Sequence, residues 1–250
     1  MRTQPAPAPD RAPQGPHRSC LVLRSLTVGY GRRIILRGVS ADIPRGKLVS
    51  IVGANGTGKS TLLKAIAGLL PLVDGTIELF GRPIDEMRSH VAYVPQREEV
   101  DWSFPVSVRD VVMMGRYPRL GWFRPARPED EAAVDAALEE LGIADLARRH
   151  VSELSGGQQR RTFIARAVAQ EPDVVLLDEP MSGIDAATHD RILELFDDWR
   201  RRGKVIVQAT HGDVHGESMI VLRRRGDSAE AARLGHHAAD TEEHHGAHAH

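Results

Sequence analysis

Residues 53–61 read Gly-Ala-Asn-Gly-Thr-Gly-Lys-Ser-Thr, and their types and spacing suit phosphate chemistry. An apolar run over 48–52 precedes them, and apolar residues at helical spacing follow over 62–70. A glycine-rich turn between a strand and a helix lets successive backbone N–H groups point at a polyphosphate. Lys59 would reach the β- and γ-phosphates, and the Ser60 hydroxyl would ligate Mg²⁺. The predicted phosphate loop therefore consists of Gly53, Asn55, Gly56, Thr57, Gly58, Lys59, Ser60 and Thr61.

Two acids, Asp178 and Glu179, directly follow the apolar run 174–177. Such a run is typical of a strand buried on both faces of a parallel sheet. Because α/β sheets bind ligands beyond the carboxyl ends of their strands, both carboxylates are expected at a ligand-binding edge.

Two further stretches suit a nucleotide. Ser155, Gly156 and Gly157 come just before a helical pattern, where free N–H groups at a helix N-terminus would make a second anion site. Tyr30 stands between two glycines on an expected turn, and its ring can stack on adenine. An exposed turn tyrosine without a role remains the alternative at that position.

Alternating and helical apolar patterns predict the elements that would position these residues. A turn is expected at Asp74-Gly75, and Ser107 is a candidate helix cap. Residues 107–170 are predicted to be mainly helical and inserted between two strand-rich parts, which indicates an α/β fold. Strands are expected at 21–28, 34–36, 39–43, 48–52, 76–80, 90–94, 174–177, 205–207 and 219–222, and helices at 62–70, 107–114, 129–141, 161–170 and 185–202.

Composition narrows the class of protein. The 250 residues include 33 basic and 34 acidic side chains. The net charge of −1 lacks the positive excess that is typical of nucleic-acid-binding proteins. The single cysteine, Cys20, fits a reducing compartment. No apolar run approaches the roughly 18 residues of a membrane span, and no secretion signal is present. A soluble cytoplasmic protein is the expectation.

Both ends of the chain read as disordered. Residues 1–19 are rich in proline and alanine, and residues 227–250 are rich in histidine. Neutral imidazoles on such a tail can bind Zn²⁺, Ni²⁺ or Cu²⁺ weakly, while a solvated end without function is the alternative. The histidines concerned are His236, His237, His244, His245, His248 and His250.

Taken together, these residues resemble the nucleotide-binding subunit of an ATP-binding cassette (ABC) transporter, over about residues 20–222. Tyr30 matches the adenine-stacking aromatic, 53–61 the Walker A loop and Gln96 the Q-loop. The signature motif, Walker B, the D-loop and the switch histidine match 154–159, 174–179, 182–185 and His211. The resemblance implies a P-loop NTPase cassette over 20–226, with a RecA-like core, an antiparallel β subdomain and an inserted helical subdomain over about 107–170.

The resemblance also implies an ATPase that uses ATP and Mg²⁺. Asp178 would hold Mg²⁺ with Ser60 and Gln96, and Glu179 would be the general base. Gln96 would also touch the attacking water, and His211 would contact the γ-phosphate. The signature residues Ser155, Gly156, Gly157 and Gln158 of one copy would complete the ATP site of a second copy. The D-loop and the residue after His211 depart from the usual family pattern, which bears on the geometry of the switch.

Residues 93–97, 101–108, 111–117 and 121–124 look like the cassettes of manganese, zinc and iron importers. Ordinary packing of their aromatic residues is the alternative. The implied partners are integral membrane permease subunits and an extracytoplasmic metal-binding protein, with this chain on the inner face of the membrane. An ABC transporter ATPase for another cargo, a soluble non-transport ABC ATPase and a metal-binding protein with a degenerate cassette remain the competing hypotheses.

Overall fold

The computed structural model describes residues 19–96, 105–120, 125–210, 218–225 and 228–236. Its main helices are α1 (Lys59–Ile66), α2 (Val108–Met113), α3 (Tyr117–Leu120), α4 (Pro128–Glu140), α5 (Gly156–Gln170) and α6 (Ala186–Arg201). Its strands are β1 (Leu21–Tyr30), β2 (Arg33–Ile43), β3 (Leu48–Val52), β4 (Leu72–Leu79), β5 (Arg82–Pro83), β6 (Val91–Val94), β7 (Val174–Asp178), β8 (Val205–Thr210), β9 (Ser218–Arg225) and β10 (Ser228–His236).

Within the described residues the strands form one mixed sheet of 10 strands, in the order β5-β4-β1-β2-β10-β9-β3-β8-β7-β6. Strands β9, β3, β8, β7 and β6 are parallel, whereas β1 pairs antiparallel with both β2 and β4. The predicted α/β architecture, with a parallel core and an antiparallel part, is confirmed. The carboxyl ends of β3, β6 and β7 consequently meet at one edge.

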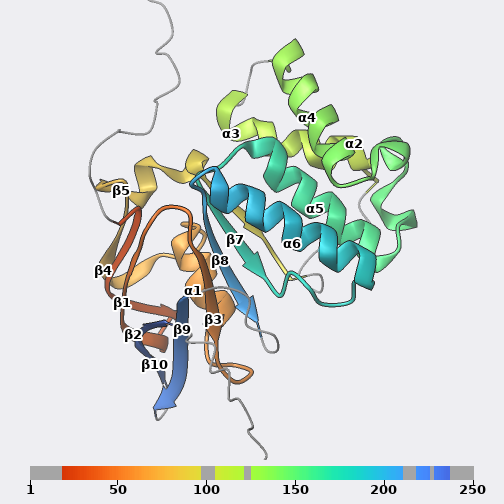
Figure 1. Cartoon of the computed structure of the whole chain (residues 1–250). Helices are drawn as coiled ribbons and strands as arrows, with labels where there is room; N and C mark the ends of the chain where they lie inside the picture. Colours follow the sequence, from red (N-terminus) through yellow and green to blue (C-terminus); the bar gives the residue numbers. More distant parts are fainter. Residues whose placement is uncertain (1–18, 97–104, 121–124, 211–217, 226–227, 237–250) are drawn as a thin grey trace, which may run out of the picture.

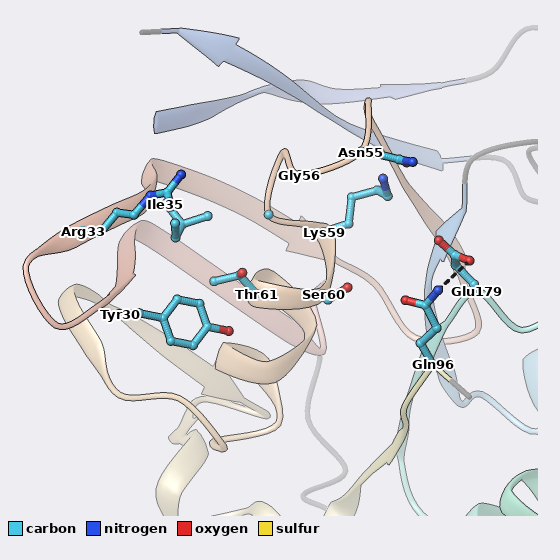
Figure 2. A pocket seen from close by; sticks show the side chains of 11 residues that line it. Tyr30, Arg33, Ile35, Asn55, Gly56, Lys59, Ser60, Thr61, Gln96 and Glu179 are labelled. Carbon is cyan, nitrogen blue, oxygen red and sulfur yellow. Dashed lines mark hydrogen bonds between the residues drawn. The ribbon is translucent and has the colours of Figure 1, made fainter. Parts of the chain in front are cut away.

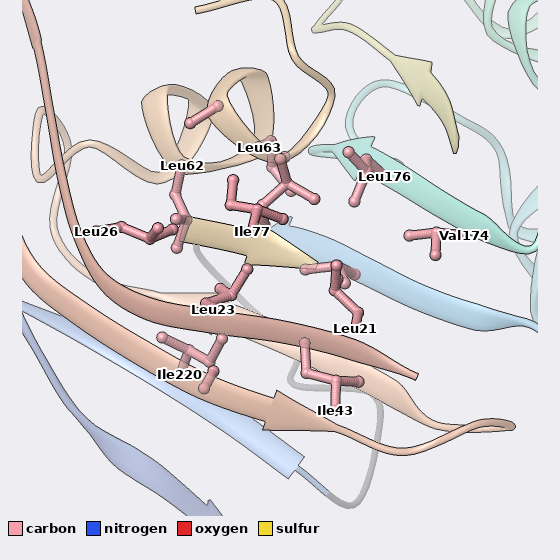
Figure 3. Packing of buried hydrophobic residues seen from close by; sticks show 14 of the residues in the cluster. Leu21, Leu23, Leu26, Ile43, Leu62, Leu63, Ile77, Val174, Leu176 and Ile220 are labelled. Atoms are coloured by element: carbon pink, nitrogen blue, oxygen red, sulfur yellow. The ribbon is translucent and has the colours of Figure 1, made fainter. Parts of the chain in front are cut away.

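The parallel strands are buried on both faces, and their side chains alternate between two hydrophobic clusters. Val174 and Leu176 of β7 pack in the cluster that contains α1 and the antiparallel strands (Figure 3). Val175 and Leu177 pack in the second cluster, with residues of α2, α4, α5 and α6. The core strands are thus packed on one face by α1 and the antiparallel strands and on the other by helices, which fixes the edge where the loops emerge.

The helices expected over 107–170 lie between β6 and β7 in the chain, and Figure 1 shows α2 to α5 gathered away from β1, β2 and β10. Ser107 caps α2 as predicted, because its side chain accepts a hydrogen bond from the Asp110 N–H. Arg116 and Asp130 form an ion pair of 2.9 Å with both side chains almost fully buried. None of the helices in the described ranges is long and apolar enough to cross a membrane.

Two local predictions for the antiparallel part are wrong. Residues 34–36 and 39–43 belong to one strand, β2, which continues through Gly38 at φ +64° with a shifted register opposite β1. The turn expected at Asp74-Gly75 lies inside β4. Gly75 has φ +92°, and a Cβ there would lie 2.4 Å from the carbonyl oxygen of Arg24. Both glycines therefore mark irregularities within strands, not chain reversals.

The disordered tail predicted from residue 227 is wrong for residues 228–236, and β9 is not the last strand. β10 pairs antiparallel with β9 and parallel with β2, so it joins the two parts of the sheet. The segment has few strand-forming residues, but its backbone forms hydrogen bonds with the edges of β2 and β9, which would otherwise be unpaired. Gly226-Asp227, a dipeptide typical of two-residue hairpins, is the sequence signal for it.

Candidate nucleotide-binding site

The phosphate loop, residues 53–61, connects β3 to α1 and needs glycine at two positions. Gly58 caps the N-terminus of α1 in the left-handed region at φ +93°, and a Cβ there would lie 2.8 Å from Ile35 Cγ2. A Cβ on Gly53 would lie 2.7 Å from the carbonyl oxygen of Leu222. The loop can therefore pack closely on β2 and β9 at the start of α1.

Side chains within the loop fold back onto its own carbonyls. Thr57 Oγ1 donates to the carbonyl of Ala54 at 2.9 Å. Lys59 Nζ donates to the carbonyls of Gly53 at 2.8 Å and Ala54 at 3.2 Å. Burial lowers the pKa of the Lys59 amine, while the nearby Glu179 and Asp178 carboxylates oppose that shift. The Lys59 ammonium thus lies against the backbone of the loop that would bind phosphate.

A pocket of about 490 Å³ opens over this loop (Figure 2). Tyr30 at the end of β1 forms one side with its ring half exposed, and Gln96 and Glu179 form the opposite side. The predicted residues that line the pocket are Tyr30, Asn55, Gly56, Gly58, Lys59, Ser60, Thr61, Gln96 and Glu179. One cavity therefore collects an aromatic ring, the phosphate loop, an amide and a carboxylate from four separate parts of the chain.

The acidic end of the pocket follows β6 and β7, which pair in parallel. Gln96 Nε2 donates to Glu179 Oε2 at 3.2 Å, and Figure 2 shows this bond across the edge of the sheet. Asp178 is 1% exposed, and the Tyr93 hydroxyl donates to its Oδ2 at 3.4 Å. Glu179 has φ +50°, a left-handed backbone that is uncommon for a residue with a Cβ.

Other predicted site residues lie elsewhere. Gly53, Thr57 and Asp178 support the pocket without lining it. The signature residues are at the N-terminus of α5 and do not line this pocket either. There Ser155 and Gln158 form a capping box, in which Gln158 Oε1 accepts from the Ser155 N–H at 2.9 Å. His211 lies outside the described residues.

Two lining residues were not predicted: Arg33 and Ile35 of β2. They are two positions apart in a strand, so their side chains share one face. No local pattern singles them out, because residues 34–36 are all apolar. Only the packing of β2 beside Tyr30 and the phosphate loop shows that this face meets the pocket (Figure 2).

Comparison with known proteins gives a consistent picture. The family model described as "ABC transporter" matches residues 36–182. The manganese transport system ATP-binding protein MntB of Bacillus subtilis is 44% identical over 189 residues, which cover 76% of each chain. The zinc transport system ATP-binding protein TroB of Treponema pallidum is 48% identical over 186 residues, covering 74% of this chain and 70% of TroB.

The solved structures agree with the sequence relatives. A structure of a metal-chelate type ABC transporter in an inward-facing conformation is similar with a TM-score of 0.70 and 30% identity. The alignment covers 82% of this chain and 79% of that one. A nucleotide-free ATP-binding cassette from an ABC transporter has a TM-score of 0.74 at 21% identity, which shows the shared fold.

Proposed function

The chain belongs to the family of ABC transporter ATP-binding subunits, ATPases that drive transport with membrane components, and from this premise we propose that it powers import of a divalent metal ion. Manganese, zinc and iron are the candidate cargoes. The proposal of a metal cargo rests on the 44–48% identity to ATP-binding proteins of manganese and zinc transport systems. The proposal has the chain working on the inner face of the membrane.

The pocket suits ATP along its whole length. The Tyr30 ring would stack on adenine beside Ile35, and the N–H groups of residues 53–61 would surround the phosphates. Lys59 would exchange its bonds to the carbonyls of Gly53 and Ala54 for bonds to the β- and γ-phosphate oxygens. Binding would therefore turn an internal loop contact into a contact with the nucleotide.

The acidic end suits metal-assisted hydrolysis. Ser60, Gln96 and Asp178 offer oxygen atoms, the donor type that Mg²⁺ prefers, and they would hold this ion. Bound Mg²⁺ neutralises charge on the β- and γ-phosphates. Glu179 would accept a proton from the attacking water, and Gln96 would release its bond to Glu179 to touch that water. His211 would contact the γ-phosphate.

The signature residues point to a second copy of the chain. Ser155, Gly156, Gly157 and Gln158 lie outside the pocket of their own chain, at a helix N-terminus that suits an anion. In a two-cassette sandwich they would complete the partner's ATP site. The other proposed partners are permease subunits in the membrane and an extracytoplasmic metal-binding protein. Cargo other than metal is the competing function, and a soluble non-transport ATPase is the more distant one.

The test compares metal-starved cells that carry the transporter with this chain or its Glu179→Gln form, together with Glu139→Gln as a matched control. Glu139 is exposed on α4, far in the chain from the phosphate loop. We expect a selective fall of manganese, zinc or iron in the Glu179→Gln cells only, because hydrolysis is lost. Unchanged levels of all three metals, with ATP hydrolysis lost, would discard the metal cargo and retain the ATPase.

A further inference from the structure

Arg160 is a buried cation to which the proposed reaction assigns no role. It belongs to α5 and is only 6% exposed. Its guanidinium donates to three backbone carbonyls: Nη1 to Pro95 at 2.7 Å, Nη2 to Asp178 at 2.7 Å and Nε to Pro180 at 3.2 Å. These acceptors belong to two distant segments that both end at the nucleotide pocket.

The residue type matters for this contact. A guanidinium is planar and carries five N–H donors in a fixed fork, so one side chain can bind carbonyls in three directions. Its positive charge also strengthens these bonds, and the two from Nη1 and Nη2 are short, at 2.7 Å. A lysine ammonium, a single donor centre on a flexible stem, cannot hold three carbonyls at fixed separations.

The three carbonyls belong to the chain neighbours of Gln96 and Glu179. Asp178 and Pro180 flank Glu179, whose left-handed backbone persists only when its surroundings fix it. Pro95 is the residue before Gln96, and the Gln96 amide donates to Glu179 Oε2 at 3.2 Å. One guanidinium thus holds the backbone on both sides of Glu179 and on the amino-terminal side of Gln96, the two residues that face the reacting water in the proposed mechanism.

We propose that Arg160 is a positioning residue for ATP hydrolysis, which sets the separation of Glu179 and Gln96 without touching the nucleotide. This inference rests on the proposed roles of those two residues. Arg160 does not line the pocket, so its loss should change turnover more than nucleotide binding. Misplacement of a reacting group by about 1 Å can cost on the order of 100-fold in rate.

The test uses the full chain with its membrane subunits and compares Arg160→Lys, Arg160→Met and Gln170→Met. Gln170 is the matched control because it is also on α5 and also holds two carbonyls, those of Ser89 at 3.2 Å and Val91 at 2.8 Å, on the amino-terminal side of β6. We expect kcat to fall about 10- to 100-fold in Arg160→Met and less in Arg160→Lys, with KM for ATP within about twofold. Gln170→Met should keep kcat within about twofold even where Tm falls.

A kcat within about twofold of wild type in both Arg160 variants would overturn the proposal. The proposal would also be overturned if a rise of KM for ATP explained the whole loss of kcat/KM in the Arg160 variants. It would be overturned as well if Gln170→Met lost as much kcat as Arg160→Met while the two variants had the same Tm. If Arg160→Met does not fold, the kcat and KM of Arg160→Lys are used to test the proposal in the same way. The Glu179→Gln variant distinguishes failure of the proposed function from failure of the positioning role. If this variant hydrolyses ATP at the normal rate, Glu179 is not the general base, and the inference about Arg160 fails with it. If Glu179→Gln is inactive while the Arg160 variants are normal, only the positioning role fails.

Discussion

At the scale of single residues, Cys20 is buried immediately before β1, where its backbone forms hydrogen bonds with Ile43 and Phe80. Burial raises the pKa of its thiol from 9.0 to about 12, with the nearby Arg45 opposing the shift and Asp173 adding to it. The folded chain disfavours the thiolate, so the protonated Cys20 thiol contributes to the free energy of unfolding. This contribution is fully present below pH 9 and is lost as the pH rises toward 12.

The wild-type chain should therefore lose stability relative to Cys20→Ala between pH 7.5 and pH 10. At pH 10 the unfolded thiol is mostly ionised, and the expected difference is about 1.4 kcal/mol in the free energy of unfolding. Urea unfolding of both chains at the two pH values measures it. The other titrating groups are common to both proteins, so an equal difference at the two pH values would contradict the prediction.

At the scale of elements, the turn after α2 approaches α5 closely. Gly115 lies in the short 3₁₀ turn after α2, and a Cβ there would lie 2.2 Å from the carbonyl oxygen of Arg166 in α5. Glycine is therefore required by packing, because any side chain would force α2 away from α5.

Gly115→Ala should lower the free energy of unfolding by about 2–3 kcal/mol through overpacking. Gly81→Ala is the control: Gly81 has φ +75° but nothing within 4 Å of a new Cβ, so only backbone strain of about 1 kcal/mol is expected. Denaturant midpoints of the two variants compare the effects. Equal destabilisation would mean that contact with α5 does not determine the glycine at position 115.

Helix α5 is also tied to β6 along its length. Arg160 donates to the carbonyl of Pro95, Arg166 to that of Tyr93, and Gln170 to those of Ser89 and Val91. The element that begins at the signature residues is thus fixed, residue by residue, to the strand that leads to Gln96. Only the Arg160 bond reaches the residue next to Gln96, whereas the Gln170 bonds hold the opposite end of β6.

At the scale of the whole molecule, each chain presents a pocket and, apart from it, a signature motif. If two copies share nucleotides, Glu179→Gln protein should dimerise with MgATP, because bound nucleotide persists when hydrolysis is blocked. Light scattering should then show a doubling of mass on addition of MgATP. Glu179→Gln protein that stays monomeric with MgATP bound would contradict the sandwich.

A second variant separates dimerisation from nucleotide binding. Adding Ser155→Arg to Glu179→Gln changes the signature motif but leaves the residues that line the pocket intact. This double variant should bind a fluorescent ATP analogue with unchanged affinity and remain monomeric. A parallel loss of nucleotide affinity would mean that Ser155 acts on the pocket of its own chain.

The sequence by itself determined the local parts of this protein. The phosphate loop, the buried strand before Asp178 and Glu179, and the cap at Ser107 depend on residues close in the chain, so spacing and side-chain type suffice to predict them. Residues 107–114, 129–141 and 185–202 were predicted as helices within a residue or two of α2, α4 and α6 for the same reason.

Tertiary structure alone decided the rest, because it depends on pairing between distant segments. Gly226-Asp227 signals a hairpin between β9 and β10, but no local pattern specifies the pairing of β10 with Leu36 of β2. Gly75 reads as a turn until the backbone of β1 is placed against it. Ile35 reaches the pocket, and Arg160 reaches three carbonyls, only after the sheet and α5 have packed together.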